Sequence, residues 1–403
     1  MTPPAAQPGY RTPYAGLKVL DVSQGIAGPY CAMLLAQYGA DVIKVEPPAG
    51  DWARGLGKRV GDHTALDLTA NRGKRSIALD LKHADGRDLL ARLATRCDVL
   101  IEKFRPGVMD RLGAGYAQVR ASNPRVLYLS VSGFGQRGPG RDRPGSDTVL
   151  QAFSGMMSVN RDGAGTPRST GFLTVDYVTG LYAFQALAAA LAARPHEAEG
   201  RHLDVSLMQS AGSFLAAKLI EERLEGGPAA RLNAPAGSYR SADGWIGITL
   251  TKEAHFPLIC ASIGRARLAT DPRYADFALR SRHMESLGPQ IQEALLAKST
   301  AEWLAVFRAA DVLASTIHDM ASWPDDPQVR AMDVVVEEAI VGLPPVPWVR
   351  IPGASDPAPG EARGRWPDIG ADGEAVLRDD LGIDEAEIAR LREAGVLSPR
   401  AAA

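Results

Sequence analysis

The sequence predicts an α/β protein with a parallel sheet, a smaller second domain and a terminal arm, and three observations support this prediction. Short apolar runs alternate with stretches of helical spacing over residues 1–135. A glycine- and proline-rich hinge follows at 225–235, and from about residue 330 the chain is extended and proline-rich. With 403 residues, 45% of them hydrophobic and 23% charged, the chain is long enough for two to three domains with a sizeable core.

The first part of the chain is predicted to contain four buried strands and one weaker candidate. The strands are expected at 18–23 (KVLDVS), 41–46 (DVIKVE), 98–104 (DVLIEKF) and 125–135 (RVLYLSVSGFG), and the weaker candidate at 76–81 (SIALDL). Apolar residues at helical spacing lie between them, as in GPYCAMLLAQYGA. Strands that alternate with helices form parallel βαβ units, so we expect a Rossmann-like, doubly wound sheet with helices on both faces.

The middle of the chain is predicted to hold a long helix and then a smaller α+β domain. Residues 176–193 are expected to form the helix, and 201–224 a further strand followed by a helix. After the hinge, an Asp-Gly turn lies between two alternating segments in GSYRSADGWIGITLT, which is typical of a β-hairpin. Amphipathic helices follow, including one at 300–312.

The last part of the chain is predicted to be an arm. A structureless stretch of this length is unusual inside a compact domain, so we expect it to pack back over another domain or subunit. It ends in a short helix at 384–395, where Asp384 and Glu387 fit a capping box. The predicted divisions are therefore 1–224, 225–330 and 331–403.

Charge and cysteine content exclude several classes of function. The net charge is −2 and the basic residues are dispersed, which gives no reason to expect nucleic acid or an anionic membrane as a partner. Three widely spaced cysteines form no CxxC pair and no zinc-type cluster, so we expect neither a structural metal nor a disulfide framework. The apolar run near 180–193 is too short and too alanine-rich to span a bilayer, and no signal-peptide pattern begins the chain. We expect a cytoplasmic protein.

Two kinds of segment offer candidate chemistry at the junctions between the predicted strands and their loops. VSQGIAGPYCAMLL (22–35) places glycines and backbone N–H groups at a helix start, which suits an anion or a thioester, or is only a helix start. The cationic segment 72–75 precedes one strand, and Lys103 and Arg105 follow another. Lys103 and Arg105 are expected at the carboxyl edge of the sheet, where open α/β sheets bind ligands, so the two cationic clusters together indicate an anionic ligand; a solvated charge cluster is the alternative.

Asp176 is a carboxylate at the start of the long apolar helix, beside Val175. It could cap that helix, or it could act in catalysis from a partly desolvated position. Other catalytic patterns do not occur in the sequence: there is no G-x-S-x-G, no G-x-x-x-x-G-K-[ST] and no H-E-x-x-H, and the seven histidines stand singly.

The chain contains, in this order, the segments GLKVLDVSQGIAGPYCAMLLAQYGADVIKVEPPAGD, NRGKRSIALDLK, DVLIEKFRPGVMDRLG, VLYLSVSGFGQRGP and TVDYVTGLYAFQAL. Together they resemble the class III CoA-transferases, which include formyl-CoA, carnitine and dicarboxylate CoA-transferases and are related to the α-methylacyl-CoA racemases. The resemblance continues through ADGWIGITL, DDPQVRAM and LGIDEAEIARLREAGVL, so it covers nearly the whole chain. It implies a Rossmann-like large domain, a small α+β domain, a C-terminal arm returning to the large domain, and an interlocked homodimer.

The resemblance places the family's catalytic aspartate on Asp176. It implies that this carboxylate attacks a donor acyl-CoA to give a mixed anhydride and CoA thiolate. The thiolate then forms an aspartyl-CoA thioester, from which the acceptor acid takes the CoA through a second anhydride. An acyl-CoA and a free carboxylic acid would be the substrates, with CoA not permanently bound. Backbone N–H groups near Ile26 and Ala27 would stabilise the oxyanion.

The same resemblance implies contacts with CoA in four loops. These positions are Asn71, Arg72, Gly73, Lys74, Lys103, Phe104, Arg105, Arg111, Ser132, Gly133, Phe134 and Gly135. CoA carries three phosphates, so the cations among them would have an electrostatic role. Arg161 and Arg168, upstream of Asp176, could orient a second carboxylate of a dicarboxylic acid or could be solvated.

Transfer is favoured over racemisation. Ser146 stands where the racemases have the histidine of a G-H-D motif, and a serine hydroxyl is too weakly basic to take an α-proton. A non-catalytic CoA-binding paralogue is a further alternative. A Rossmann-type oxidoreductase is disfavoured because the dinucleotide fingerprint is missing from the sequence.

Three positions depart from the family pattern. Ile26 replaces a glutamine of the formyl-CoA transferases, Pro47 replaces a CoA-contacting arginine, and the loop 233–244 lacks a glycine run. These departures argue against formyl-CoA:oxalate transfer and leave Asp176 in place.

Overall fold

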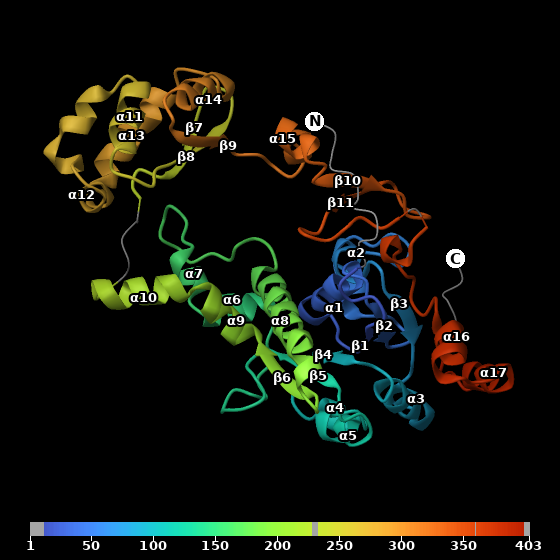
Figure 1. Ribbon diagram of the computed structural model, residues 1–403. Coiled ribbons are helices and arrows are strands. Elements are labelled where there is room, and N and C mark those ends of the chain that lie inside the picture. The colour runs from blue at the N-terminus through green and yellow to red at the C-terminus, as the bar shows by residue number, and fades with distance from the viewer. Residues whose placement is uncertain (1–11, 228–232, 359, 399–403) are drawn as a thin grey trace. The chain divides into compact units, whose positions relative to one another are not determined.

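The computed structural model describes residues 12–227, 233–358 and 360–398 (Figure 1). The chain divides into two compact units, the first comprising Met1–Ala216 with Val336–Ala403 and the second Ala217–Val335. The first division falls just after the first residue of α10 (Ala216–Glu225), in which no residue is buried. The sequence prediction assigns that helix to the large domain because the glycine- and proline-rich hinge begins only at residue 225.

Unit 1 is built on a six-stranded sheet whose strands pair in parallel, in the order β3-β2-β1-β4-β5-β6. The strands are β1 (Lys18–Asp21), β2 (Asp41–Glu46), β3 (Arg75–Ala78), β4 (Val99–Glu102), β5 (Leu127–Ser132) and β6 (Arg201–Ser206). The predicted parallel sheet is confirmed. The order reverses between β1 and β4, and open α/β sheets bind ligands beyond the carboxyl ends of the strands at such a switch point.

The side chains of these strands alternate between two hydrophobic layers. Val19 of β1 packs in one layer and Leu20 in the other, and Leu127 and Tyr128 repeat the pattern in β5. Because β1, β2, β4 and β5 are buried on both faces, they are rich in apolar residues, and this indicated them in the sequence; the edge strand β6 is partly exposed.

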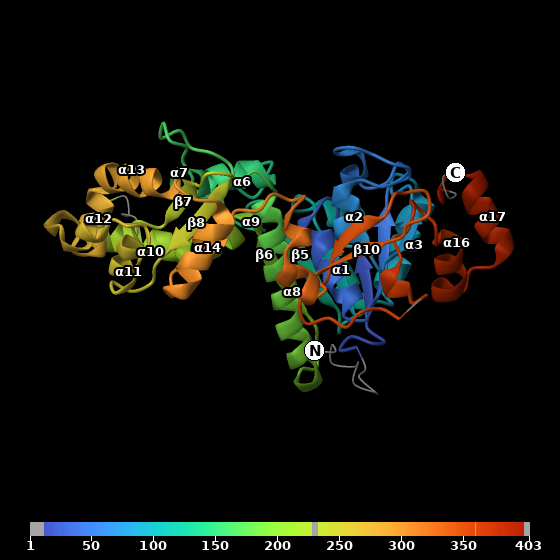
Figure 2. The ribbon, with the colours of Figure 1, turned by 90° about the horizontal axis from the view of Figure 1, so that it is seen from above.

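Helices cover both faces of the sheet (Figures 1 and 2). One layer contains α1 (Ala27–Gln37), α6 (Asp147–Phe153), α7 (Met156–Val159), α8 (Thr174–Ala193) and α9 (Leu207–Phe214). The other contains α3 (Ala84–Ala94), α4 (Val108–Arg111), α5 (Tyr116–Ser122), α16 (Gly373–Ala375), a π-helical turn (Val376–Asp380) and α17 (Glu385–Glu393). Unit 1 also contains α2 (Ala65–Asn71) and 3-10 turns at Trp52–Gly55, Arg194–His196 and Ala362–Gly364.

Helix α8 packs closely against α1. A Cβ at Gly180 would lie 2.9 Å from the carbonyl oxygen of Ala27, so a glycine permits this approach. By length and composition alone, Thr174–His196 could cross a membrane, which corrects the sequence-based statement that the apolar run is too short. The helix extends beyond the run counted in the sequence, and Val175, Ala183 and Leu187 are buried in the core of unit 1.

The C-terminal arm packs on unit 1. It contains a two-stranded sheet of β10 (Val335–Glu338) and β11 (Val346–Val349), which the sequence did not predict. Trp348 and Trp366 pack against α1, and the guanidinium carbon of Arg72 lies 4.4 and 4.6 Å from their ring centroids. Cation–π contacts therefore join the arm to the residues that precede β3.

Unit 2 has its own sheet and core. Its strands, in the order β7-β8-β9, are β7 (Gly237–Arg240), β8 (Trp245–Thr249) and β9 (Leu313–Thr316), and the predicted hairpin is β7–β8. Its helices are α11 (His255–Ser262), α12 (Phe277–Arg282), α13 (Met284–Leu295), α14 (Thr300–Ala309) and α15 (Pro327–Ala331), with 3-10 turns at Ala266–Thr270, Pro272–Tyr274 and Trp323–Asp325. Trp303 and Phe307 of α14 stack on each other within its core.

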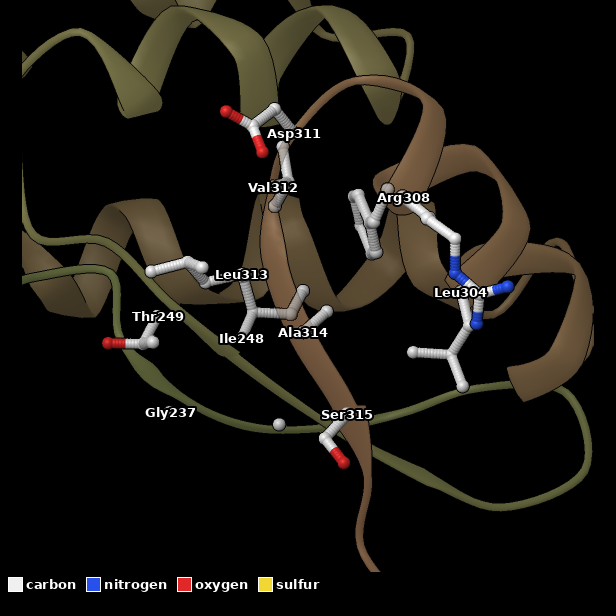
Figure 3. A pocket seen from close by; sticks show the side chains of 12 residues that line it. Gly237, Ile248, Thr249, Leu304, Arg308, Asp311, Val312, Leu313, Ala314 and Ser315 are labelled. Atoms are coloured by element: carbon white, nitrogen blue, oxygen red, sulfur yellow. The ribbon is translucent and has the colours of Figure 1, made fainter. Parts of the chain in front are cut away.

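A groove of about 620 Å³ lies in unit 2 beside α14, β8 and β9 (Figure 3). Leu304, Leu313 and Ile248 are among its apolar lining residues, and Arg308 and Asp311 are its charged ones. The groove contains none of the predicted site residues.

Candidate active site

The loop between β1 and α1 is held by buried charges. The N–H of Gly25 donates to both carboxylate oxygens of Asp51, at 2.9 and 3.1 Å. Lys44 Nζ donates to Asp51 Oδ2 and to the carbonyl oxygen of Ser23, both at 2.9 Å. Gly25 has a φ of 81°, and a Cβ there would clash with the ring of Trp52, so this turn requires glycine. Because the buried charges are paired and hydrogen-bonded, the loop is fixed in place.

Lys74 completes this network from the segment before β3. Its Nζ donates to Asp21 Oδ2 at 2.7 Å, to Asn71 Oδ1 at 2.8 Å and to the carbonyl oxygen of Pro29 at 2.9 Å. Although burial alone would raise it, Lys74 and Lys44 hold the pKa of Asp21 below its usual range. The ammonium group of Lys74 is therefore directed at the protein's own carboxylate.

Arg72 and Gly73 connect the same segment to the arm. Arg72 pairs with Glu338, and the N–H of Gly73 donates to the carbonyl oxygen of Arg365 at 2.7 Å. The structure thus places the predicted CoA-contacting residues 71–74 inside unit 1, and Asn71, Arg72 and Lys74 are each 1% exposed as whole residues.

Asp147 holds the N-terminus of α8. Its Oδ2 accepts hydrogen bonds from the backbone N–H groups of Val175, at 2.7 Å, and Asp176, at 3.1 Å, while its Oδ1 accepts one from Gln151 Nε2 at 2.5 Å. Burial and the nearby Asp176 carboxylate raise the pKa of Asp147. Asp176 lies in the first helical turn and Leu173 is the N-cap residue, so the interpretation of Asp176 as the helix cap is wrong. Asp147 performs that role from another helix.

The side chain of Asp176 faces Lys103. Lys103 Nζ donates to Asp176 Oδ1 at 2.8 Å, and the two side chains are only 15% and 6% exposed. Within residues 12–227, 233–358 and 360–398, Oδ2 of Asp176 accepts no hydrogen bond. The carboxylate therefore has one oxygen fixed by a cation and one oxygen open.

Three elements converge here at the switch point of the sheet. Lys103 directly follows β4, and a Cβ at Gly28 of α1 would lie 3.6 Å from the Cβ of Lys103. Ile26 and Ala27 are buried at the start of α1, which has no side-chain cap. The N–H groups of this helix start, which no side chain caps, and the cation of Lys103 thus lie beside the carboxylate of Asp176.

The remaining predicted residues after β4 differ in exposure. Phe104 packs partly buried against one core layer. Arg105 and Arg111 are exposed, and their guanidinium groups make no hydrogen bond or ion pair within the part of the chain that the structure describes. These two cations are therefore free to meet an anion.

The turn after β5 is closely packed. Ser132 Oγ accepts a hydrogen bond from the N–H of Gly135 at 3.0 Å, and Phe134 is buried. A Cβ at Gly133 would lie 3.0 Å from the Cα of Gly145. The glycine at position 133 thus permits the close approach of two backbone segments.

Sequence reasoning missed two groups of residues beside the site. One is the pair Asp147 and Gln151, which fixes the start of α8. The other is Arg137, Arg141 and Arg143, three exposed arginines in the loop that continues from the turn after β5. The second group had a visible signal, since three arginines occur within seven residues of a glycine- and proline-rich loop.

Arg161 and Arg168 are bonded within their own loop. Arg161 donates to the carbonyl oxygens of Ser158 and Gly165, both at 2.8 Å, and Arg168 donates to Asp162 Oδ2 at 2.7 and 3.0 Å. Each guanidinium group therefore has two of its nitrogen–acceptor bonds made within this loop, which favours a structural role for both arginines.

The described residues contain neither a cluster suited to a metal ion nor an accessible thiol. No group of three or more His, Cys, Asp or Glu suited to a metal ion occurs within 12–227, 233–358 and 360–398. Cys31, Cys97 and Cys260 are free and buried, and burial raises the pKa of Cys97 and of Cys260 to about 12. Buried thiols of this kind are unreactive.

Comparison with known proteins identifies the class of enzyme. Residues 14–373 match CoA-transferase family III. The chain is 35% identical to acetyl-CoA:oxalate CoA-transferase of Acetobacter aceti over 96% of this chain and 99% of that protein. It is 32% identical to human succinyl-CoA:glutarate CoA-transferase over 96% of this chain and 90% of that one. The crystal structure of a CAIB/BAIF family protein from Brucella suis matches with a TM-score of 0.80 at 30% identity, over 92% of this chain and all of that one. The chain belongs to CoA-transferase family III and is an enzyme of that family.

Substitution Asp147→Ala is expected to lower both stability and activity. Loss of the cap should cost about 1–2 kcal/mol, and displacement of Asp176 should lower kcat for CoA exchange about tenfold or more. Asp276→Ala provides a matched control, because Asp276 caps α12 in unit 2 by accepting from the N–H of Leu279 at 2.7 Å. Thermal unfolding and exchange assays should show both variants destabilised and only Asp147→Ala impaired. Equal activity in the two variants would contradict the role assigned to Asp147.

Glu102, at the end of β4, makes stability depend on pH. Its Oε2 accepts from the N–H of Phe104 at 2.7 Å, and burial raises its pKa to about 7 from an ordinary value of 4.5. Between these values the folded protein holds a proton that the unfolded chain has lost. The free energy of unfolding therefore falls as the pH rises through this window, by about 3 kcal/mol from this group.

Glu102→Gln should remove that contribution. Urea unfolding at about pH 5 and about pH 8 should show a smaller loss of stability on raising the pH than in the native protein. Glu393→Gln, at an exposed position of α17, should leave the pH dependence unchanged. A native-like pH dependence in Glu102→Gln would refute the assignment.

Proposed function

We propose that this enzyme transfers CoA from an acyl-CoA thioester to a free carboxylic acid, with Asp176 as the nucleophile. The observation that carries the proposal is the state of the Asp176 carboxylate: it is buried at the switch point, held at Oδ1 by Lys103 and open at Oδ2. A carboxylate that must attack a thioester needs a fixed orientation, a free oxygen and little competing water.

The first half of the reaction forms the aspartyl-CoA intermediate. Asp176 Oδ2 attacks the acyl carbon of the donor, the C–S bond breaks, and the electron pair stays on sulfur as CoA thiolate. The thiolate then attacks Cγ of Asp176 in the mixed anhydride, and the donor leaves as its carboxylate. The second half repeats these two steps in reverse order with the acceptor acid. No net proton transfer is needed.

The start of α1 is proposed to stabilise the oxyanion on the acyl carbon of the substrate. The N–H groups near Ile26 and Ala27 lie at a helix N-terminus that has no side-chain cap, beside Lys103 and Asp176. Donors at such a position stabilise negative charge that develops on a carbonyl oxygen. The buried pair of Lys44 and Asp51 fixes the loop that leads into this turn.

We propose that Arg105 and Arg111 bind the phosphates of CoA, because both are exposed and their guanidinium groups have no partner in the described residues. Phe104 and the turn 132–135 would form the wall beside them. Residues 71–74 would act by shaping the site and anchoring the arm, since Lys74 is occupied by Asp21.

The acceptor is proposed to be a carboxylic acid such as the small dicarboxylates named for relatives of this chain. Racemisation of a 2-methylacyl-CoA is the weaker candidate, because Ser146 and Asp147 stand at the start of α6 and offer no imidazole base. A CoA-binding paralogue without catalysis would leave the paired Lys103 and Asp176 without a role.

We also propose an interlocked homodimer. Helix α10 supports an assembly larger than one chain, because Leu219, Ile220 and Leu224 are 72%, 58% and 81% exposed. A cytoplasmic location is proposed as well, which the three free cysteines support.

Asp176→Asn is expected to abolish transfer and the covalent intermediate. Native protein incubated with acetyl-CoA or succinyl-CoA should gain the mass of CoA less one water on the peptide that contains Asp176, and the variant should not. Exchange onto oxalate or glutarate should fall at least about 10³-fold, the scale of losing an essential nucleophile. Glu385→Gln changes an exposed acid in the first turn of α17 and should keep full activity. Exchange at the native rate in Asp176→Asn would exclude this mechanism.

The interlocked dimer predicts an unusual resistance to dissociation. Light scattering should return the mass of two chains even after strong dilution, because interlocked chains separate only by unfolding. Mixed tagged and untagged protein should therefore not exchange subunits below the unfolding temperature. The mass of a single chain, or rapid subunit exchange, would contradict the proposal.

A further inference from the structure

We propose that Lys103 is a catalytic residue whose ammonium group stabilises the oxyanion formed on Asp176 itself, when the aspartyl carbonyl is attacked. The proposal rests on the proposed function, because it assigns a role within the same site. It differs from the role that the resemblance implies for Lys103, which is a contact with CoA.

The geometry distinguishes the two oxygens of Asp176. Lys103 Nζ holds Oδ1 at 2.8 Å, and Oδ2 accepts no hydrogen bond from any described residue. The open oxygen is therefore the one that attacks the donor. Once Oδ2 has formed a bond to the acyl carbon, Oδ1 is the carbonyl oxygen of the aspartyl group. The ammonium group is then already at the distance at which a donor stabilises an oxyanion.

Two of the four bond-forming steps place negative charge on Oδ1. In the first, CoA thiolate attacks Cγ of Asp176, the charge moves to Oδ1 in the tetrahedral intermediate, and it leaves with the donor carboxylate as the C–Oδ2 bond breaks. In the second, the acceptor carboxylate attacks Cγ of the aspartyl-CoA thioester, and the charge leaves with CoA thiolate as the C–S bond breaks. Lys103 keeps its proton throughout and donates a hydrogen bond in both steps.

The other two steps occur at the acyl carbons of the donor and the acceptor. Their oxyanion forms on the substrate carbonyl, for which the N–H groups near Ile26 and Ala27 are proposed. The site would thus contain two separate oxyanion stabilisers, one for the substrate and one for the enzyme's own acyl group.

The positive charge of Lys103 also balances the negative charge that is present between the bond-forming steps. The reacting atoms carry one negative charge in turn as the Asp176 carboxylate, the CoA thiolate and the released carboxylate. One adjacent ammonium group therefore balances the charge at each stage, and no stage leaves it without a counter-ion in a poorly hydrated site. Asp147 cannot serve this purpose because it is itself an acid, held by backbone N–H groups.

The surroundings of Lys103 leave its ammonium group available for this work. Asp176 Oδ1 is its one hydrogen-bonding partner within residues 12–227, 233–358 and 360–398. Lys44 and Lys74, by contrast, each have partners on two or more residues and side chains with no exposed area. The partial exposure of Lys103, at 15%, leaves room for reacting atoms beside Nζ.

The test compares Lys103→Met and Lys103→Gln with Lys18→Met, which removes a lysine from the opposite end of the parallel sheet. The assay uses acetyl-CoA or succinyl-CoA with oxalate or glutarate, whichever pair the native enzyme exchanges fastest. Lys103→Met should lower kcat about 10²-fold, the effect of losing one oxyanion donor, with little change in KM for the acyl-CoA. Lys103→Gln keeps a neutral hydrogen-bond donor, so its kcat should lie between those of the native enzyme and Lys103→Met. Lys18→Met should match the native enzyme.

Rapid quenching and mass spectrometry should locate the affected step. In Lys103→Met, both the appearance of the CoA adduct on Asp176 and its discharge by the acceptor acid should slow about 10²-fold. A raised KM with a native kcat would show instead that Lys103 binds CoA, and would overturn the proposal. A native kcat with a native KM would overturn it as well.

Chemical restoration of the positive charge at position 103 provides a measurement that does not depend on Lys103→Met or Lys103→Gln. Lys103→Cys can be alkylated after folding, since Cys31, Cys97 and Cys260 are buried. 2-Bromoethylamine restores an ammonium group and should recover kcat at least about tenfold over the unmodified variant, whereas iodoacetamide adds a neutral group and should recover less. Equal recovery by both reagents would contradict a charge-based role.

The CoA adduct on Asp176 distinguishes failure of the proposed function from failure of the role proposed for Lys103. If the native enzyme forms no CoA adduct on Asp176, the proposed function and the role of Lys103 both fail. If the native enzyme forms the adduct and Lys103→Met forms and discharges it at the same rate, only the role of Lys103 fails.

Discussion

The hydrogen bonds from the start of α8 to Asp147 fix the position on which the chemistry depends. The first N–H groups of a helix have no partner within it, and inside a protein they need an acceptor. Asp147 supplies one oxygen to two of these groups, and Gln151 holds its other oxygen. Because the cap comes from another helix, the side chain of Asp176 is free to face the switch point. A residue that capped its own helix would have its carboxylate turned back onto the backbone.

The fold was largely predictable because the central strands β1, β2, β4 and β5 are buried on both faces. β2 has the predicted bounds, and its Val42, Ile43 and Val45 are the closely spaced apolar residues that indicated a buried strand. The edge elements were harder: β9 and β10 are partly exposed, so their residues do not show the apolar run of a buried strand. The split between α9 and α10 was also missed, because apolar spacing continues across Leu215.

The candidate site was predictable in its members but not in their pairing. Asp176 and Lys103 were both identified, yet they are 73 residues apart and no spacing rule relates them. The cationic segment 72–75 shows the same limit. An arginine or lysine in a sequence indicates a need for an anion, and the anion can be a ligand or a carboxylate of the protein. Here Lys74 meets Asp21, a pairing that the order of residues does not reveal.

The discontinuity of unit 1 has a consequence for how the chain folds. One core layer joins Leu79 and Leu89 from the first part of the chain to Leu377 and Leu391 from the arm, and the whole of unit 2 lies between them in the sequence. During synthesis α3, α4 and α5 cover only part of that face of the sheet until the last residues emerge, so the first unit cannot close before the second has been made. Long-range closure of this kind is slow, and the uncovered apolar face is open to aggregation meanwhile. The rate of productive assembly would then be set by the arrival of the arm.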